Sequence, residues 1–174
     1  CNFPDYTNPV VREWWAGLFK ELISDIGVKG VWNDMNEPAV MEVPNKTFPM
    51  DVRHDYDGNP CSHRKAHNIY GTQMARATYH GVKRFAYPKR PFVITRSAYS
   101  GAQRYTSSWT GDNVATWEHL WIANIQVQRM CISGMGFTGS DIGGFAEQPT
   151  GELYARWIQL GVFHPFCRTH SSGD

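Results

Sequence analysis

Two acidic residues, Asp34 and Glu37, stand three positions apart in the stretch KGVWNDMNEP, at the end of a short apolar run. Paired carboxyl groups are the usual equipment of general acid–base chemistry, in which a positioned side chain gives or takes a proton during the reaction. This pair could be a complete catalytic site. Alternatively, one member could act with a partner elsewhere in the chain while the other has a structural role.

The alternation of side chains along a strand separates the two acids. Trp32 and Asp34 are predicted to point to one face of a short strand, and Asn33 to the opposite face. Glu37 falls beyond this strand and directly before Pro38, whose ring restricts the preceding residue to an extended conformation. Glu37 is therefore expected to brace the loop or to cap a following turn.

Helices and strands alternate along most of the chain. Residues 8–27 are predicted to form a helix, since Asn8 can cap it and Pro9 suits its first turn. Residues 39–64 are rich in Pro, Gly, Asn and Asp, which predicts a long loop. The other predicted elements are strands at 28–32, 90–97, 107–113, 135–144 and 164–170, and helices at 66–86, 115–134 and 151–163.

This order predicts an α/β fold, built from β–α–β units around a parallel sheet. In a β/α barrel the active site lies at the carboxyl ends of the strands. A single acid at a strand end is usually a cap or a loop anchor, whereas several together indicate a functional site. Spacing alone leaves Asp112 and Asp141 as equal candidates for the catalytic partner of Asp34. The residues at the five predicted strand ends are Asp34, Arg96, Asp112, Asp141 and His170.

The bulk composition argues against several classes of partner. The chain has 174 residues, for which one domain is the default, and its net charge of +1 with no Lys/Arg block argues against nucleic acid. No apolar run is long enough to span a bilayer, so no membrane partner is expected. Aromatic residues make up 14%, including seven Trp, and their flat rings suit stacking on sugars, although any single Trp is more often core.

The cysteines and histidines predict no metal site. The sequence has no C-x-x-C, and the wide spacing of Cys1, Cys61, Cys131 and Cys167 favours buried free thiols. A metal-dependent barrel hydrolase is an alternative suggested by the seven histidines, but no H-x-H pair stands at a strand end. No role is assigned to three histidines that are expected to be solvated in or beside the long loop, namely His54, His63 and His67.

The chain resembles glycoside hydrolase family 31, the α-glucosidase and α-xylosidase family. GVWNDMNEP looks like the family signature, and the similarity continues through HNIYG, RPFVITRSAYSGAQRY, WTGDN, GSDIGGF and RWIQLGVFHPFCRTH. These motifs follow in the right order and cover nearly the whole chain. The WTGDN and SDIGGF forms are most similar to the α-glucosidase branch. FCRTH departs from the more usual F-x-R-N-H, but it leaves His170 in place.

This resemblance implies a retaining mechanism that needs no metal and no cofactor. Asp34 matches the family nucleophile and Asp112 matches the general acid/base. The resemblance therefore selects Asp112 rather than Asp141 as the partner of Asp34. Three residues match positions that bind the hydroxyl groups of the cleaved sugar, and four match the apolar wall around it, with core packing still open for Met35 and Phe145. The first set is Arg96, Asp141 and His170, and the second is Trp32, Met35, Trp109 and Phe145.

The resemblance also implies a (β/α)8 TIM barrel, of which this chain holds only the C-terminal part, about strands 4–8. Residues 1–174 are thus expected to be a fragment of a single catalytic barrel domain, inactive alone. The expected substrate is an oligosaccharide or α-glucoside, with α-xylosidase, α-transglucosidase or a non-catalytic sugar-binding relative as alternatives. The start CNFPDYTNP is not a signal peptide; a sugar-scavenging role would suit a secreted or periplasmic enzyme, and the oligomeric state is open.

Overall fold

The computed structural model describes residues 2–173 and divides the chain into two compact units, Cys1–Thr106 and Ser107–Asp174. Helices and short strands, most of them in parallel pairs, alternate in both units, which confirms the predicted α/β class. The first unit contains α1 (Pro9–Gly17), a π-helical turn η1 (Glu21–Asp25), β1 (Val31–Asn33), β2 (Arg53–His54), β3 (Cys61–Ser62), α2 (His63–Ala86), β4 (Val93–Thr95) and η2 (Ala102–Arg104). The second contains β5 (Ser107–Trp109), α3 (Trp117–Ile132), β6 (Thr138–Gly139), β7 (Asp141–Ile142), α4 (Gly151–Gly161) and β8 (Arg168–Thr169).

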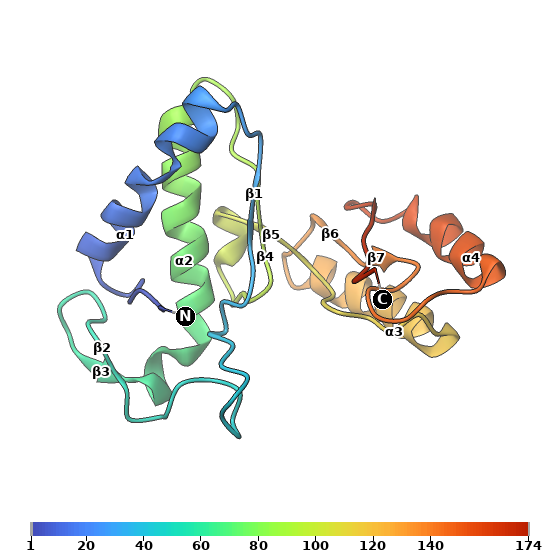
Figure 1. Ribbon diagram of the computed structural model, residues 1–174, viewed down its shortest axis with the longest axis horizontal. Helices are drawn as coiled ribbons and strands as arrows, with labels where there is room; N and C mark the ends of the chain where they lie inside the picture. The colour runs from blue at the N-terminus through green and yellow to red at the C-terminus, as the bar shows by residue number, and fades with distance from the viewer. Residues whose placement is uncertain (1, 174) are drawn as a thin grey trace. The chain divides into compact units, whose positions relative to one another are not determined.

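In the first unit, α1 lies beside the long helix α2, and β1 pairs with β4 in parallel (Figure 1). The register places Trp32 opposite Ile94 and Asn33 opposite Thr95. The core is formed where the α1–η1 segment, α2 and β4 bury their apolar side chains together, a burial that is the main favourable contribution to folding. Its centre consists of Phe19, Ile23, Val82 and Val93.

The first helix is shorter than predicted. The side chain of Asn8 caps α1 by accepting a hydrogen bond from the Val10 backbone N–H at 2.8 Å, as expected. The α-helix ends at Gly17, however, because the Leu18 N–H donates to the Trp15 carbonyl in a tighter turn. The chain then forms η1, where the Val28 N–H donates to the Leu22 carbonyl. The helix predicted over 8–27 is therefore interrupted: residues 9–17 are α-helical, Leu18 forms a turn, and helical backbone continues through residues 19–20 into η1.

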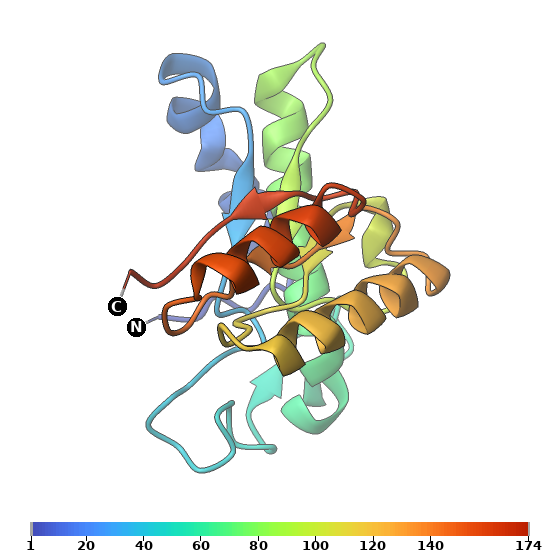
Figure 2. The same ribbon diagram turned by 90° about the vertical axis from the view of Figure 1, so that its right-hand side faces the viewer.

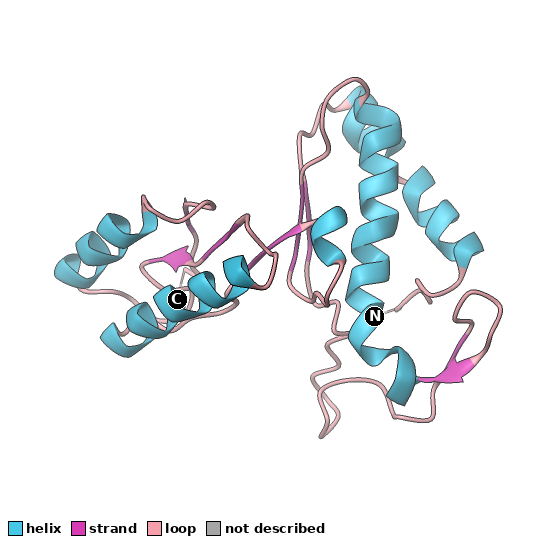
Figure 3. Ribbon diagram, turned by 180° about the vertical axis from the view of Figure 1, so that it is seen from behind, coloured by secondary structure: helices cyan, strands magenta, loops and turns pink. Residues whose placement is uncertain are grey.

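In the second unit, the predicted single strand over 135–144 is wrong. β6 pairs with β5, whereas β7 pairs with β8 in a separate ladder that sets Asp141 beside Arg168. Gly139 allows the change, because a Cβ there would stand 1.8 Å from the Phe166 carbonyl oxygen. The ladders are short segments between long loops (Figure 3). Helices α3 and α4 lie side by side (Figure 2) around the cluster Ala123, Ile142, Leu153 and Trp157.

The thiols are free but less buried than predicted. Cys61 and Cys131 are half-buried and Cys167 is exposed, while Cys1 lies outside the described residues. The prediction that the thiols are buried rests on residue type, and residue type alone does not determine where the fold places a cysteine. No helix within residues 2–173 has the length and apolar character needed to cross a membrane.

The long loop predicted over 39–64 contains structure that the composition did not indicate. Strands β2 and β3 pair in antiparallel fashion, and α2 begins at His63 rather than at residue 66. His54 and His63 are buried at 3% and 0% exposure, so the expectation of solvated loop histidines is wrong for both. Local composition cannot reveal this burial, because it depends on packing against the distant N-terminal segment.

These two histidines join distant segments through a chain of hydrogen bonds. Asp5 Oδ1 lies 3.1 Å from His54 Nδ1, His54 Nε2 lies 2.9 Å from His63 Nδ1, and His63 Nε2 lies 3.0 Å from Thr47 Oγ1. Because a carboxylate only accepts, His54 donates from Nδ1 and accepts at Nε2. His63 then donates from Nδ1 and accepts at Nε2 from the Thr47 hydroxyl. All four ring nitrogens of His54 and His63 have a hydrogen-bond partner when both rings are neutral.

Acid is expected to weaken this connection. Burial, with smaller contributions from His67 and His54, lowers the pKa of His63 from its ordinary 6.5 to about 4. Between these two pH values the unfolded chain binds a proton that the folded ring does not, so the free energy of unfolding falls, by up to about 3 kcal/mol. The stabilising contribution of the neutral His63 ring is complete above the pKa of the unfolded state, 6.5. It is lost as the pH falls toward the pKa of the folded state, about 4.

Urea unfolding of the full-length protein at several pH values tests this, with a His63→Asn variant as comparison. The amide of asparagine can donate to His54 but does not titrate. We expect the wild-type protein to lose stability between about pH 6.5 and about pH 4 faster than the variant. Equal slopes for the two proteins would show that His63 is not the group responsible.

Candidate active site

The first group of candidate residues lies where β1 and β4 end. The Arg96 backbone N–H donates to the Asn33 carbonyl at 3.0 Å, so the two strand ends stay side by side. The Asn33 side chain is buried at 2% exposure, whereas that of Asp34 is 50% exposed. This confirms the predicted alternation. Asp34 Oδ1 accepts from the Met35 N–H at 2.8 Å, which fixes the carboxylate at the strand end with a face open to solvent.

Arg96 contacts both acids of the opening pair. Its Nε donates to Glu37 Oε1 at 2.9 Å, its Nη1 stands 3.5 Å from Asp34 Oδ1, and the same Nη1 stands 3.2 Å from Met35 Sδ. The bond to Glu37 is well formed, while the contact with Asp34 is long for a hydrogen bond. Glu37 therefore sets the orientation of the guanidinium that lies beside Asp34. The sequence indicates a structural role for Glu37 but does not identify Arg96 as its partner.

Asn36 connects the same two strand ends through side-chain hydrogen bonds. It is buried at 2% exposure, its Nδ2 donates to Thr95 Oγ1 at 2.8 Å, and its Oδ1 accepts from the Ser97 N–H at 3.0 Å. Helix α2 approaches closely here, since a Cβ on Gly71 would stand 2.7 Å from Ser97 Cβ. The loop that carries Asp34 is thus tied to the loop that carries Arg96. Nothing in the local sequence indicated this function for Asn36.

Removing the Glu37 carboxylate should loosen Arg96. We expect Glu37→Ala to lower kcat/KM of the full-length protein by about 10–100-fold toward the substrate class that the sequence resemblance implies, because a displaced positioning group costs that much. Glu37→Gln should recover most of the loss, since its amide oxygen can still accept from Arg96 Nε. Steady-state kinetics on the two variants checks this, and equal losses in both would contradict a positioning role.

The second group of candidate residues lies in the other unit, where backbone hydrogen bonds connect three loops. The Phe145 N–H donates to the Asn113 carbonyl at 2.7 Å, and the Ser172 N–H donates to the Phe145 carbonyl at 2.8 Å. The rings of Phe145 and His170 stack at 5.3 Å with an interplanar angle of 30°. The structure thereby brings the loop after β5, which carries Asp112, next to the loop after β7 and the segment after β8.

Asp112 and Asp141 stand in different environments within this unit. Asp112 is exposed in the turn after β5. Asp141 is 0% exposed, and its Oδ1 accepts a hydrogen bond from Arg168 Nη2. Burial raises the pKa of Asp141, although Arg168 offsets part of that shift. Asp141 Oδ2 is buried and has no hydrogen-bond partner among residues 2–173.

Arg168 is not among the site residues predicted from the sequence, although the strand pattern contains a signal for it. Arg168 stands two residues before His170, so alternation along a strand places both on one face. His170 is exposed and borders a cavity of about 360 Å³, which is also lined by Ile142, Tyr154 and Thr169. Such a cavity could admit a small polar ligand.

The residues predicted to form an apolar wall differ in exposure. Trp32, Met35 and Phe145 are half-buried, whereas Trp109 is only 5% exposed. Among the described residues, no group of three or more His, Cys, Asp or Glu side chains is arranged to hold a metal ion.

Comparison with known proteins places these features in a family. The model of the glycosyl hydrolases family 31 TIM-barrel domain matches residues 1–174, and the chain belongs to this family. It is 49% identical to alpha-glucosidase 2 of Bacillus thermoamyloliquefaciens over 170 residues, which are 97% of this chain and 21% of that protein.

Solved structures agree with this assignment. The chain matches a glucosidase II alpha subunit bound to alpha3-Glc2 with a TM-score of 0.87 and 42% identity, covering 96% of this chain and 18% of that one. It matches a family 31 alpha-glucosidase from Bacteroides thetaiotaomicron with a TM-score of 0.84 and 41% identity, covering 99% of this chain and 27% of that one. The chain spans about a fifth of the length of the curated relatives it matches, 18–21% in the first three.

Proposed function

We propose that the full-length protein is a retaining, exo-acting α-glucosidase that removes terminal α-linked glucose from oligosaccharides by double displacement. The observation that carries the proposal is the half-exposed Asp34 carboxylate at the end of β1, held by the Met35 N–H and flanked by Arg96. An accessible carboxylate that is held in a fixed position is what a nucleophile in glycoside cleavage requires. Family membership and relatives named as α-glucosidases support the same activity.

The proposed reaction has two steps. First, a carboxylate oxygen of Asp34 attacks the anomeric carbon while Asp112 gives its proton to the departing oxygen, which leaves a β-linked glycosyl ester. Second, Asp112 removes a proton from water, the water oxygen attacks the anomeric carbon, and the ester bond to Asp34 breaks. This pathway requires the two carboxyl groups to stand about 5–5.5 Å apart across the bond that is cut.

The surroundings of Asp112 and Asp141 support Asp112 as the proton-transfer group. Such a group exchanges its proton with the leaving sugar and then with water, and Asp112 is the exposed member of the two. A raised pKa would also suit a general acid, and Asp141 has one. Its Oδ1, however, is held by Arg168, and the side chain is fully buried.

We assign Asp141, His170 and Arg96 to the hydroxyl groups of the bound sugar. The buried Oδ2 of Asp141, without a partner in residues 2–173, is an acceptor that a sugar hydroxyl would satisfy. Trp32, Met35 and Phe145 would contact the apolar faces of the ring, and the buried Trp109 is assigned to the same apolar wall.

We further propose that residues 1–174 are part of a single (β/α)8 barrel, holding about strands 4–8, and are not active alone. The exposed apolar side chains support this, because faces of this kind normally pack against other elements. They recur along the first helical segment and near the ends of α3 and α4. Examples are Val10 at 74%, Trp14 at 53%, Ile132 at 88% and Phe163 at 84% exposure.

Hydrolysis of p-nitrophenyl α-glucoside and p-nitrophenyl α-xyloside by the full-length protein tests the proposed activity. We expect the glucoside to be hydrolysed with the higher kcat/KM and the glucose to be released first as the α-anomer. A clear preference for the xyloside would replace the proposed activity with α-xylosidase. Products that are mainly longer sugars would make it a transglucosidase.

A further inference from the structure

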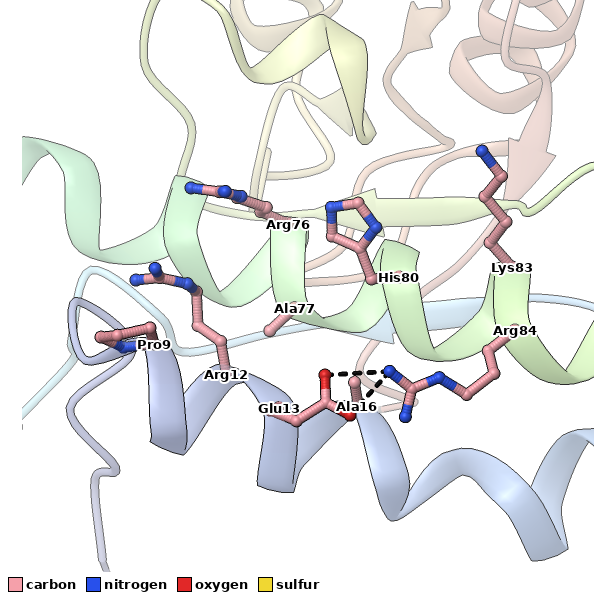
Figure 4. A pocket seen from close by; sticks show the side chains of 9 residues that line it. All are labelled: Pro9, Arg12, Glu13, Ala16, Arg76, Ala77, His80, Lys83 and Arg84. Atoms are coloured by element: carbon pink, nitrogen blue, oxygen red, sulfur yellow. Dashed lines mark hydrogen bonds and ion pairs between the residues drawn. The ribbon is translucent and has the colours of Figure 1, made fainter. Parts of the chain in front are cut away.

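A polar cavity of about 490 Å³ lies between α1 and α2, away from the candidate catalytic residues of the first unit. Helix α1 contributes Arg12 and Glu13, and α2 contributes Arg76, His80, Lys83 and Arg84 (Figure 4). Four permanent cations and one carboxylate border the same space. Neither the fold nor the proposed reaction requires such an arrangement of like charges.

Two of these cations are already compensated. Arg12 donates to the Tyr6 and Thr7 carbonyls at 2.9 and 2.8 Å and forms an ion pair with Asp57. Arg84 pairs with Glu13 at 2.7 Å, the contact drawn across the gap in Figure 4. These contacts fix one wall of the cavity.

The other two cations have no acidic partner. Among residues 2–173, no carboxylate lies within ion-pairing distance of Arg76 or Lys83. The contacts of Arg76 are limited to Gln73 Oε1 at 3.5 Å, and the Lys83 ammonium lies 6.0 Å from the centre of the Tyr79 ring. In Figure 4 both side chains extend from the same side of α2, with His80 between them, but the Arg76 guanidinium points toward the N-terminal end of α2 and the Lys83 ammonium points away from α1. Lys83 and His80 are exposed. The border of the cavity therefore carries two positive charges without an acidic partner among residues 2–173.

His80 responds to this positive field. Its pKa is lowered by burial and further by Arg76, Lys83 and Arg84, with only Glu13 acting in the opposite direction. At neutral pH the ring is therefore uncharged and can donate one hydrogen bond and accept another. It adds a neutral polar group between the two cations without adding to their charge.

We propose that this cavity between α1 and α2 binds a dianionic phosphate group, either free phosphate or a small phosphate monoester. A dianion matches the two uncompensated charges of Arg76 and Lys83, and a guanidinium beside an ammonium is a common pair of phosphate ligands. The phosphate oxygens would accept from Arg76 and from the donor nitrogen of His80, and the long, exposed side chain of Lys83 would turn toward the bound anion. The volume leaves room for the small organic part of an ester.

Isothermal titration of the full-length protein with sodium phosphate tests the proposal, at about pH 8 where phosphate carries two charges. Sodium chloride at equal ionic strength serves as the blank. Glycerol phosphate, with glycerol as its own blank, shows whether the site takes an ester as well as the free ion. We expect one phosphate bound per chain, and weaker binding as salt increases.

Two double variants make the assignment specific. Arg76→Met/Lys83→Met keeps the apolar stems but removes both charges, and should weaken binding by about tenfold or more. Lys89→Met/Arg90→Met removes the same two residue types from the exposed turn just after α2 and should bind like the wild type. Thermal unfolding in chloride confirms that each variant is folded.

The Lys89→Met/Arg90→Met variant also separates binding in the cavity from the general stabilising effect of phosphate, which acts on any protein surface. The proposal is overturned if the full-length protein binds neither phosphate nor glycerol phosphate above the blanks. It is also overturned if the Arg76→Met/Lys83→Met variant retains wild-type affinity, or if both double variants lose affinity equally. Binding of free phosphate alone, or of both ligands, supports it and defines the accepted form.

Discussion

Replacing Asp34 with asparagine in the full-length protein is expected to lower kcat for an activated α-glucoside by about 10⁴-fold or more. The reason is chemical, because the amide oxygen of asparagine cannot form the glycosyl ester. The local structure should be retained. Asp34 Oδ1 accepts from the Met35 N–H at 2.8 Å, and the asparagine oxygen can accept the same bond. Substrate affinity should therefore change much less than turnover.

A charge-matched control is available in the same unit. Asp51 is exposed, and its substitution by asparagine removes one negative charge away from β1 and β4. Steady-state kinetics and thermal unfolding on both variants separate loss of the nucleophile from loss of charge or stability. Activity of Asp34→Asn within about tenfold of the wild type would remove the basis for the proposed mechanism.

Asp112→Ala is expected to show the behaviour of a missing proton-transfer group. Cleavage of substrates with poor leaving groups should fall by about 10²–10⁴-fold, the typical contribution of general acid–base catalysis. Substrates with good leaving groups need no proton at the first step, so they should form the glycosyl ester and then accumulate it.

Azide distinguishes the roles of the two aspartates by the stereochemistry of the product. In Asp112→Ala, azide should attack the β-linked ester from the opposite face and yield the α-glycosyl azide. In Asp34→Ala, azide should take the place of the nucleophile and yield the β-glycosyl azide. Chromatography against the two authentic azides identifies each product. The reverse pattern would exchange the roles, and α-azide from an Asp141→Ala variant would transfer the acid–base role to Asp141.

The parts of the fold that depend on local sequence were predictable. The alternation that buries Asn33 and exposes Asp34 follows from strand geometry, and the Asn8 cap follows from residue type. The α/β class follows from the order of elements. In each case the determining interactions lie within a few residues of one another.

The features that were missed depend on contacts between distant segments. His54 and His63 are buried because the N-terminal Asp5 reaches the loop, almost fifty residues away. Asp141 belongs to a separate ladder because its partner strand, with Arg168, comes after α4. Composition and periodicity contain no information about such pairs. The family resemblance supplied the choice of Asp112 over Asp141, which spacing had left open.

Within the candidate site, the structure changes the interpretation of the opening acid pair. Asp34 and Glu37 are not alternatives for one task, because Arg96 lies between them and contacts both. Glu37 holds the guanidinium, and the guanidinium lies beside the proposed nucleophile. A pair of acids three residues apart can thus divide into a reacting group and the group that positions its neighbour.

The most direct test of the proposed mechanism is to trap the glycosyl ester. A fluorinated α-glucosyl fluoride has a leaving group that departs readily, while its ring fluorine slows hydrolysis of the intermediate. Incubation with the full-length protein, proteolysis and tandem mass spectrometry then locate the added mass. The proposal predicts one fluoroglucosyl group per chain, attached to the Asp34 carboxylate. An adduct on any other residue, or rapid turnover to the inverted sugar with no adduct, would contradict it.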